Sequence, residues 1–164
     1  MNDEKYLAII NTYTNTLYKM AYSICKNKQD AEDVVQNTFL KLYTTNKPFE
    51  SDEHLKNWLI KVTINNCKHI FMTPWKNKTV LLDEYKESGY YTIDHSINNS
   101  EVLNAVLSLP TKYRIVVHLY YYEDYSIREI SKIIDEKETT IQTRLMRARQ
   151  KLKNTLKEVW QDEN

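Results

Sequence analysis

The chain has 164 residues, of which 41% are hydrophobic and 27% are charged, so it can fill one modest core or two small ones. Its 23 Lys and Arg residues nearly balance its 22 Asp and Glu residues, which excludes a uniformly basic nucleic-acid binder, an acidic tail and a polybasic membrane anchor. One glycine and three prolines are too few for a β-rich fold, and no run approaches the roughly 20 apolar residues of a membrane span. We therefore expect an all-α protein that stays in the cytoplasm without membrane insertion.

The first two helices are predicted from apolar periodicity and charge. Apolar residues follow the three-or-four spacing of one helix face from Tyr6 to Ile24. A second helix is predicted to begin at Asp30, which would cap it and, with Glu32 and Asp33, place negative charge at the positive end of the helix dipole. The side chains expected to face inward are Ala31, Val34, Val35, Phe39 and Leu42.

A third helix is predicted after the loop that contains Pro48, and it runs to about Phe71. Its inward stripe is expected to be Leu55, Trp58, Leu59 and Val62, and its outer face Asn57, Lys61, Ile64, Asn65 and Lys68. No acidic residue occurs between His54 and Leu82, so this outer face suits a nucleic-acid strand, with the Pro48–Asp52 loop beside it. Trp58 fits a core position at least as well as a platform for a base, and Asn66 is expected to be a hydrogen-bonded buried amide.

The periodicity then fades over residues 72–100, which predicts a flexible linker between two small helical domains at 1–71 and 101–164. The second domain is expected to begin with a short helix before Pro110. The apolar positions of the helix after Pro110 are Tyr113, Val116, Val117, Tyr120 and Tyr121.

Two predicted capping boxes, Ser126 with Glu129 and Thr139 with Gln142, open the last two helices. These helices would have about nine and seventeen residues and be joined by the turn 135–138, the pattern of a helix-turn-helix, whose second helix enters the DNA major groove.

Charge supports this interpretation, because residues 137–153 carry six basic side chains against Glu138 alone, a local balance of +5. The buried stripe of this helix is expected to be Ile141, Leu145, Ala148 and Leu152. On the opposite face, Arg147 and Thr143 are the expected base contacts and Met146 an apolar contact, whereas Arg144 and Arg149 are assigned to packing or phosphate. The alternative is a solvated basic face with no ligand.

Four motifs, the last of them in two segments, resemble one family, the extracytoplasmic function (ECF) sigma factors of bacterial RNA polymerase. DAEDVVQNTFLK at 30–41 resembles the signature DAEDxxQExFL, and WLIKVTIN at 58–65 resembles WLxxIAxN. LSLPTKYR at 107–114 resembles the LPxxxR start of the second domain. SIREI at 126–130 and TIQTRLMRARQKL at 140–152 resemble the YxEIA and TVKSRLxRARxxL pattern. The chain departs from the family at Asn37, Ser131, Thr139 and Gln142.

The resemblance implies a non-enzymatic polymerase subunit for promoter recognition, with a stress- or signal-responsive set of genes. Its implied partners are core RNA polymerase, through the β′ clamp helices and the β flap, promoter DNA, and an anti-sigma factor. The residues implied for core binding are Asp30, Glu32, Asp33, Gln36, Asn37 and Leu40. Those implied for the minus-ten element are Trp58, Lys61, Asn65 and Lys68, and those for the minus-thirty-five element are Thr140, Gln142, Thr143, Arg144, Met146, Arg147 and Arg149.

Two other functions fit parts of the sequence. A helix-turn-helix regulator that acts without polymerase would share the second domain but has no reason to carry the acidic helix at 30–43, and a helical adaptor for proteins alone would not need the basic final helix. Cys25 and Cys67 are expected to be free, partly buried thiols. No catalytic motif, cofactor loop or metal-ligand spacing occurs, so we expect neither an enzyme nor a cofactor.

Overall fold

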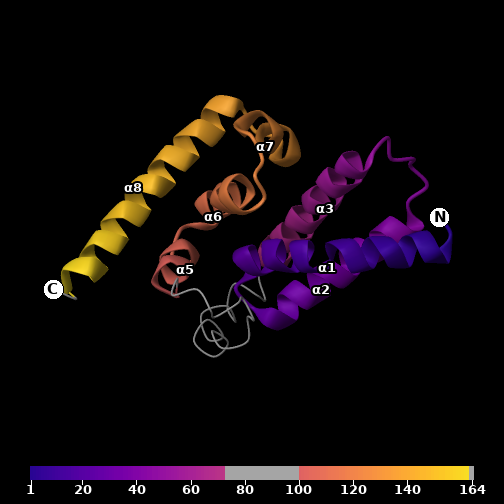
Figure 1. Ribbon diagram of the computed structural model, residues 1–164, viewed down its shortest axis with the longest axis horizontal. Coiled ribbons are helices and arrows are strands. Elements are labelled where there is room, and N and C mark those ends of the chain that lie inside the picture. Colours follow the sequence, from indigo (N-terminus) through magenta and orange to yellow (C-terminus); the bar gives the residue numbers. More distant parts are fainter. Residues whose placement is uncertain (73–99, 163–164) are drawn as a thin grey trace. The chain divides into compact units, whose positions relative to one another are not determined.

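The computed structural model describes residues 1–72 and 100–162, and every regular element in these two ranges is helical (Figure 1). The chain divides into two compact units, Met1–Tyr90 and Tyr91–Asn164. The all-α prediction is confirmed. Of the linker predicted at 72–100, Met72 ends one helix and Ser100 begins another, while residues 73–99 lie outside the described residues.

The first unit is a bundle of three helices, α1 (Asp3–Cys25), α2 (Lys28–Thr44) and α3 (Asp52–Met72), and each of them packs against the other two (Figure 1). The largest side chains at the centre of this bundle are fully buried: Leu17, Met20, Ile24, Val34, Leu42, Leu59, Ile60 and Ile64. Cys25 and Cys67 are free thiols, as predicted, but they are buried rather than partly buried.

The start of α2 differs from the prediction. Asn27, not Asp30, is the N-cap, because its side-chain oxygen accepts a hydrogen bond of 2.9 Å from the backbone N–H of Asp30. Asp30 therefore lies in the first turn of the helix, where its charge still suits the positive end of the helix dipole.

The inward face of α3 is wider than predicted, because this helix packs against two neighbours rather than one. Ile64, expected on the outer face, is 2% exposed, and Ile60 and Thr63 are fully buried. Trp58, expected on the inward stripe, is only half-buried. The amide of Asn66 is half-buried and donates to the hydroxyl of Thr38 on α2 at 3.2 Å, so its hydrogen bond is confirmed but not its full burial.

The second unit consists of α5 (Ser100–Leu107), α6 (Thr111–Val117), the π-helical turn η1 (His118–Tyr122), α7 (Ile127–Ile134) and α8 (Glu138–Asp162). Figure 1 shows α5, α6 and α7 along one side of α8, and α8 contacts all three. A core cluster joins α5, α6 and α8 through Val106, Leu109, Tyr113, Val117 and Ala148. The prediction for Tyr121 is wrong: α6 ends at Val117, and Tyr121 on η1 is 50% exposed.

The helix-turn-helix pair is α7 and α8. The capping box of Ser126 and Glu129 at the start of α7 is confirmed, with reciprocal hydrogen bonds of 3.1 Å. The second predicted box is wrong, because α8 begins at Glu138 and Thr139 lies inside its first turn. With 8 and 25 residues, α7 is close to its predicted length and α8 is longer than predicted.

Candidate functional site

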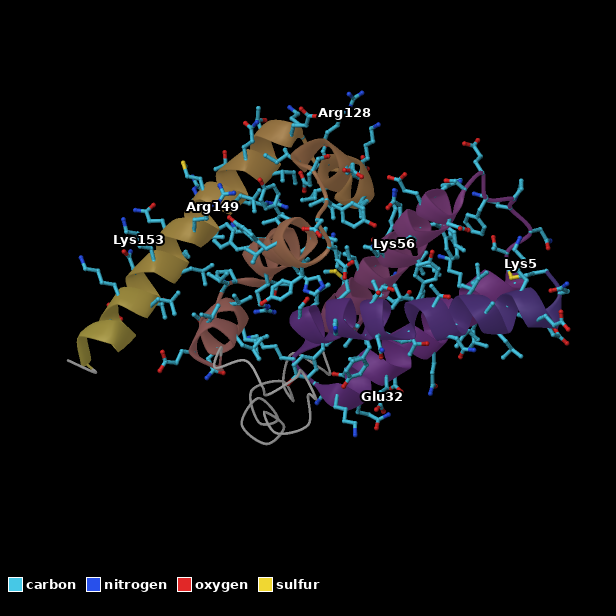
Figure 2. The ribbon with its side chains drawn as sticks, viewed as in Figure 1. Lys5, Glu32, Lys56, Arg128, Arg149 and Lys153 are labelled. Atoms are coloured by element: carbon cyan, nitrogen blue, oxygen red, sulfur yellow. The ribbon has the colours of Figure 1, made fainter. Side chains whose placement is uncertain are left out.

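Three helix faces carry the residues predicted to bind partners, one each on α2, α3 and α8. On α2, the buried side chains Val34, Val35 and Phe39 fix which side of the helix faces out. Of the predicted core-binding residues, Asp33, Gln36, Asn37 and Leu40 are exposed, whereas Asp30 and Glu32 are half-buried. Figure 2 shows Glu32 projecting from α2.

The α2 face also has an apolar end, of which the sequence analysis included Leu40 but not Tyr43. Leu40 is 61% exposed and Tyr43, three residues later, is 56% exposed. The ring of Tyr43 lies edge-on to Tyr6 of α1 at 5.0 Å, and the Tyr6 hydroxyl donates to the carbonyl of Phe39 at 2.8 Å. The spacing of Tyr43 from Leu40 is the signal that could have identified it. The face thus combines a carboxylate and amides with an apolar pair, a composition suited to a protein partner.

On α3, the side chains of Lys61, Asn65 and Lys68 are all exposed and share one stripe by their three- and four-residue spacing. They bring two cations and one amide to the same surface. Nothing acidic interrupts this stripe, so it can attract a phosphate backbone while the amide contacts a base.

Trp58 begins the same stripe and is held by the loop before α3. Phe49 of this loop lies edge-on to Trp58 at 5.4 Å and to His54 at 5.5 Å. The Pro48–Asp52 loop therefore contacts α3 at Trp58, whereas its place beside Lys61 and Asn65 stays a prediction. Phe49 is a residue that the sequence analysis missed. A groove of about 500 Å³ adjoins the loop, lined by residues 45–52 together with Met1, Lys5, Ile9 and Leu55.

On α8, the predicted buried stripe is confirmed for Ile141, Leu145 and Ala148, which are inaccessible to solvent, and Leu152 is half-buried. Of the predicted DNA-binding side chains, Gln142, Met146, Arg147 and Arg149 are exposed, and Thr140, Thr143 and Arg144 are half-buried. Figure 2 shows Arg149 and Lys153 on α8, one turn apart.

Three of these side chains already have partners within the second unit. The Thr143 hydroxyl donates to the carbonyl of Thr139 at 2.9 Å, which leaves its methyl group and its acceptor lone pairs for a ligand. Arg144 pairs with Glu136 at 3.3 Å. Arg149 donates from Nε to the Tyr121 hydroxyl at 2.6 Å. By contrast, Arg147 has no hydrogen bond or ion pair to any residue of the described second unit.

Ser131 explains one departure from the family pattern. Its hydroxyl donates to the carbonyl of Glu136 at 2.5 Å, and the N–H of Glu136 donates back to the carbonyl of Ser131 at 3.1 Å. These two bonds close the turn between α7 and α8, where Asp135 adopts the left-handed conformation with φ of 57°.

A metal site and a membrane span are both absent from residues 1–72 and 100–162. No group of three or more His, Cys, Asp or Glu side chains gathers there in a way that could hold a metal ion. None of the helices in these ranges is long and apolar enough to span a membrane.

Comparison with known proteins places the chain in a family. Sequence profiles of "Sigma-70 region 2" and "Sigma-70, region 4" match residues 9–73 and 99–152. ECF RNA polymerase sigma factor SigM of Bacillus subtilis is 30% identical over 88% of this chain and 91% of its own, and RNA polymerase sigma factor SigV of the same organism is 28% identical over 85% and 83%.

Solved structures share the fold. The sigma factor RpoE of Bartonella quintana, in complex with the anti-sigma factor NepR, superposes with a TM-score of 0.72 at 21% identity, covering 94% of this chain and 98% of that one. CnrH, in complex with the cytosolic domain of CnrY, superposes with a TM-score of 0.68 at 20% identity, covering 96% and 90%.

Proposed function

We propose roles for the three faces from one premise: this chain belongs to the ECF RNA polymerase sigma factors. As a member of this family it acts with RNA polymerase in promoter recognition and transcription initiation. The observation that carries the assignment of roles is that the two matched regions coincide with the two helical units, each with an exposed polar face on a rigid helix.

Residues 1–71 are the part that docks on core polymerase and contacts the minus-ten element. Docking uses the α2 face of Asp33, Gln36, Asn37, Leu40 and Tyr43, flanked by Asp30 and Glu32. Leu40 and Tyr43 at the end of this face would be buried against the partner, and the carboxylates select a basic partner surface. The resemblance to the family assigns this partner as the β′ clamp helices.

The α3 stripe is the contact surface for the opened minus-ten strand. Lys61 and Lys68 contact phosphate, Asn65 contacts a base, and Trp58, supported by Phe49, lies at the end of the stripe as a stacking surface.

Residues 101–164 recognise the minus-thirty-five element with α8 in the major groove and meet the β flap. Arg147 is the principal base contact because it is exposed and makes no hydrogen bond or ion pair within the described second unit. Met146, which is 59% exposed, suits a thymine methyl group. Residues 72–100 link the two parts, and the protein acts without catalytic chemistry, in the cytoplasm where its polymerase is.

An anti-sigma factor is a further proposed partner. RpoE of Bartonella quintana, with which this chain shares its fold, was solved in complex with the anti-sigma factor NepR. Such a partner would keep this chain from core polymerase until a signal releases it.

The decisive experiment is transcription in vitro. The purified chain is added to sigma-free core polymerase with a library of promoter fragments, and initiation sites are mapped. We expect initiation at a shared pair of upstream elements only when the chain is present. DNA binding by the chain alone, with no stimulation of core polymerase, would favour an independent helix-turn-helix regulator instead.

A further inference from the structure

A cation held between two tyrosines connects η1 with α8. The Nε of Arg149 donates to the hydroxyl of Tyr121 at 2.6 Å. The guanidinium carbon of Arg149 also lies 5.5 Å from the ring centre of Tyr120 and 5.6 Å from that of Tyr121. These two rings meet edge-on at 4.9 Å, so Arg149 has a fixed aromatic surface on η1.

These contacts leave the charged end of Arg149 available. The hydrogen bond to Tyr121 occupies Nε, and the Tyr120 hydroxyl is a second hydrogen-bond neighbour of the guanidinium group, which still leaves N–H donors of this exposed side chain for a ligand. Arg149 is exposed, and Tyr121 is half exposed. The hydrogen bond to Tyr121 also raises the pKa of Arg149, so the side chain keeps its charge. Two parallel N–H donors on a fixed cation fit a phosphate group in the bidentate geometry of arginine.

The position of Arg149 favours phosphate over a base edge. Its neighbour Ala148 is fully buried, and Arg149 itself is tethered to η1, 28 residues earlier in the chain. An extension into the major groove would break the Tyr121 hydrogen bond and both ring contacts. Arg147 is not restrained in this way.

We propose that Tyr121 is a positioning residue that holds Arg149 as a preformed contact for one phosphate of the DNA backbone. This inference rests on the proposed function of α8 as the DNA-recognition helix. A long arginine side chain ordered before binding loses less conformational entropy when DNA arrives, so the Tyr121 hydroxyl strengthens DNA binding without touching DNA.

The test is a double-mutant cycle in the reconstituted holoenzyme. Tyr121→Phe removes only the hydroxyl and keeps the ring, and Arg149→Ala removes the cation. Tyr122→Phe is the matched control, because Tyr122 is also exposed but stacks on His118 instead. The affinity of each holoenzyme for a selected promoter and for scrambled DNA is measured at several salt concentrations, together with thermal unfolding of each variant chain.

Four results are expected. Tyr121→Phe weakens binding to both DNAs by about two- to tenfold, the loss that corresponds to ordering one long side chain. Arg149→Ala lowers the salt dependence by about one unit of slope. Tyr121→Phe has no further effect in the Arg149→Ala background, and Tyr122→Phe binds like the parent.

Three results of the binding measurements would overturn the inference. The first is that Tyr121→Phe binds DNA like the parent, and the second is that Tyr121→Phe loses the same affinity for DNA with and without Arg149. The third is that Arg149→Ala leaves the salt dependence of binding unchanged. Each would mean that the contacts of Arg149 with Tyr120 and Tyr121 are purely structural. If Tyr121→Phe unfolds at a lower temperature and also changes the base preference, Tyr121 supports the fold of the second unit, and the inference likewise fails. If the parent holoenzyme selects no promoter, the proposed function itself fails, which is a separate outcome.

Discussion

A buried cation, Arg114, closes the turn between α5 and α6. It is only 4% exposed, and its Nη1 donates to the carbonyls of Leu107 at 3.3 Å and Leu109 at 2.6 Å. Nη2 donates to the Thr111 hydroxyl at 3.1 Å. The basic residue of the LPxxxR motif therefore stabilises the fold, because it donates hydrogen bonds to carbonyls at and just after the end of α5 that have no partner within a helix.

We expect Arg114→Ala to lower the free energy of unfolding of the second unit by about 3 kcal/mol, since it leaves buried carbonyls unsatisfied. Chemical denaturation monitored by circular dichroism measures the loss. Arg128→Ala, at an exposed position of α7, is the control and should change stability by less than about 0.5 kcal/mol. Equal stability of the two variants would contradict a structural role for Arg114.

Arg147 is the residue-scale test of base recognition. A bidentate arginine contact contributes about 1–3 kcal/mol, so Arg147→Ala should weaken binding to the preferred minus-thirty-five sequence about tenfold or more and remove the preference at one base pair. Selection from randomised upstream elements by the holoenzyme measures this. Arg149→Ala is the comparison and should weaken all sequences alike, and an unchanged motif for Arg147→Ala would refute its assignment as a base contact.

At the scale of elements, α2 uses its two sides for different purposes. Its inner side is anchored by Val34 and Leu42 and by the buried hydroxyl of Thr38, which lies 3.3 Å from that of Thr63 on α3. Both hydroxyls also donate to carbonyls of their own helices, so the polar pair is satisfied inside the core. Substitutions on the outer side should therefore change binding without changing the fold.

Asp33→Lys should reduce assembly with core polymerase about tenfold or more, a loss of about 1.4 kcal/mol, because it reverses charge in the centre of the α2 face. Co-purification at moderate salt measures assembly, and circular dichroism checks the fold. Glu4→Lys, at an exposed position of α1, is a matched charge reversal that should assemble normally. Normal assembly of Asp33→Lys would place the docking surface elsewhere.

The α3 stripe makes a separate prediction. Asn65→Ala should relax the preference at one position of the minus-ten element, and Lys61→Ala should lower the salt dependence of promoter binding by about one unit of slope. Permanganate footprinting of the holoenzyme follows strand opening. Asn11→Ala on the exposed side of α1 should leave opening and preference unchanged. Should Asn65→Ala behave in the same way, the stripe is a solvated surface.

At the scale of the whole molecule, charge is unevenly distributed along a chain with a net charge of +1. The excess of positive charge lies in residues 137–153, whereas the α2 face carries carboxylates. Under the proposed function, this segregation would let one nearly neutral chain bind a nucleic acid and a protein surface through different helices.

Docking on core polymerase through α2 and upstream recognition through α8 should therefore be separable by substitution. Arg147→Ala should assemble with core polymerase like the parent, and Asp33→Lys should leave the upstream motif unchanged in the holoenzyme that still forms. Because the two sites lie on different units of the chain, the free-energy effects of the double variant on promoter binding should add within about 0.5 kcal/mol. The measurement is transcription initiation as each variant chain is titrated into core polymerase. A deviation from additivity larger than about 0.5 kcal/mol would mean that docking and upstream recognition are coupled.

The sequence alone determined the features that depend on local order along the chain. Helical periodicity identified the buried stripe of α8 and the inner side of α2, because each of these helices hides one continuous face. The capping box at Ser126 was equally predictable, since its two partners are three residues apart. The exposed positions of Asp33, Lys61, Asn65 and Arg147 followed from the same periodicity.

The tertiary structure decided what depends on contacts between distant residues. Ile64 is buried because α3 packs against two helices, and no periodicity within α3 indicates how many neighbours it has. Phe49 supports Trp58 through a loop contact, and Tyr121 holds Arg149 across 28 residues. Helical periodicity shows which side chains share a face, but only the packed chain determines which of them meet, because that depends on where other segments lie in space.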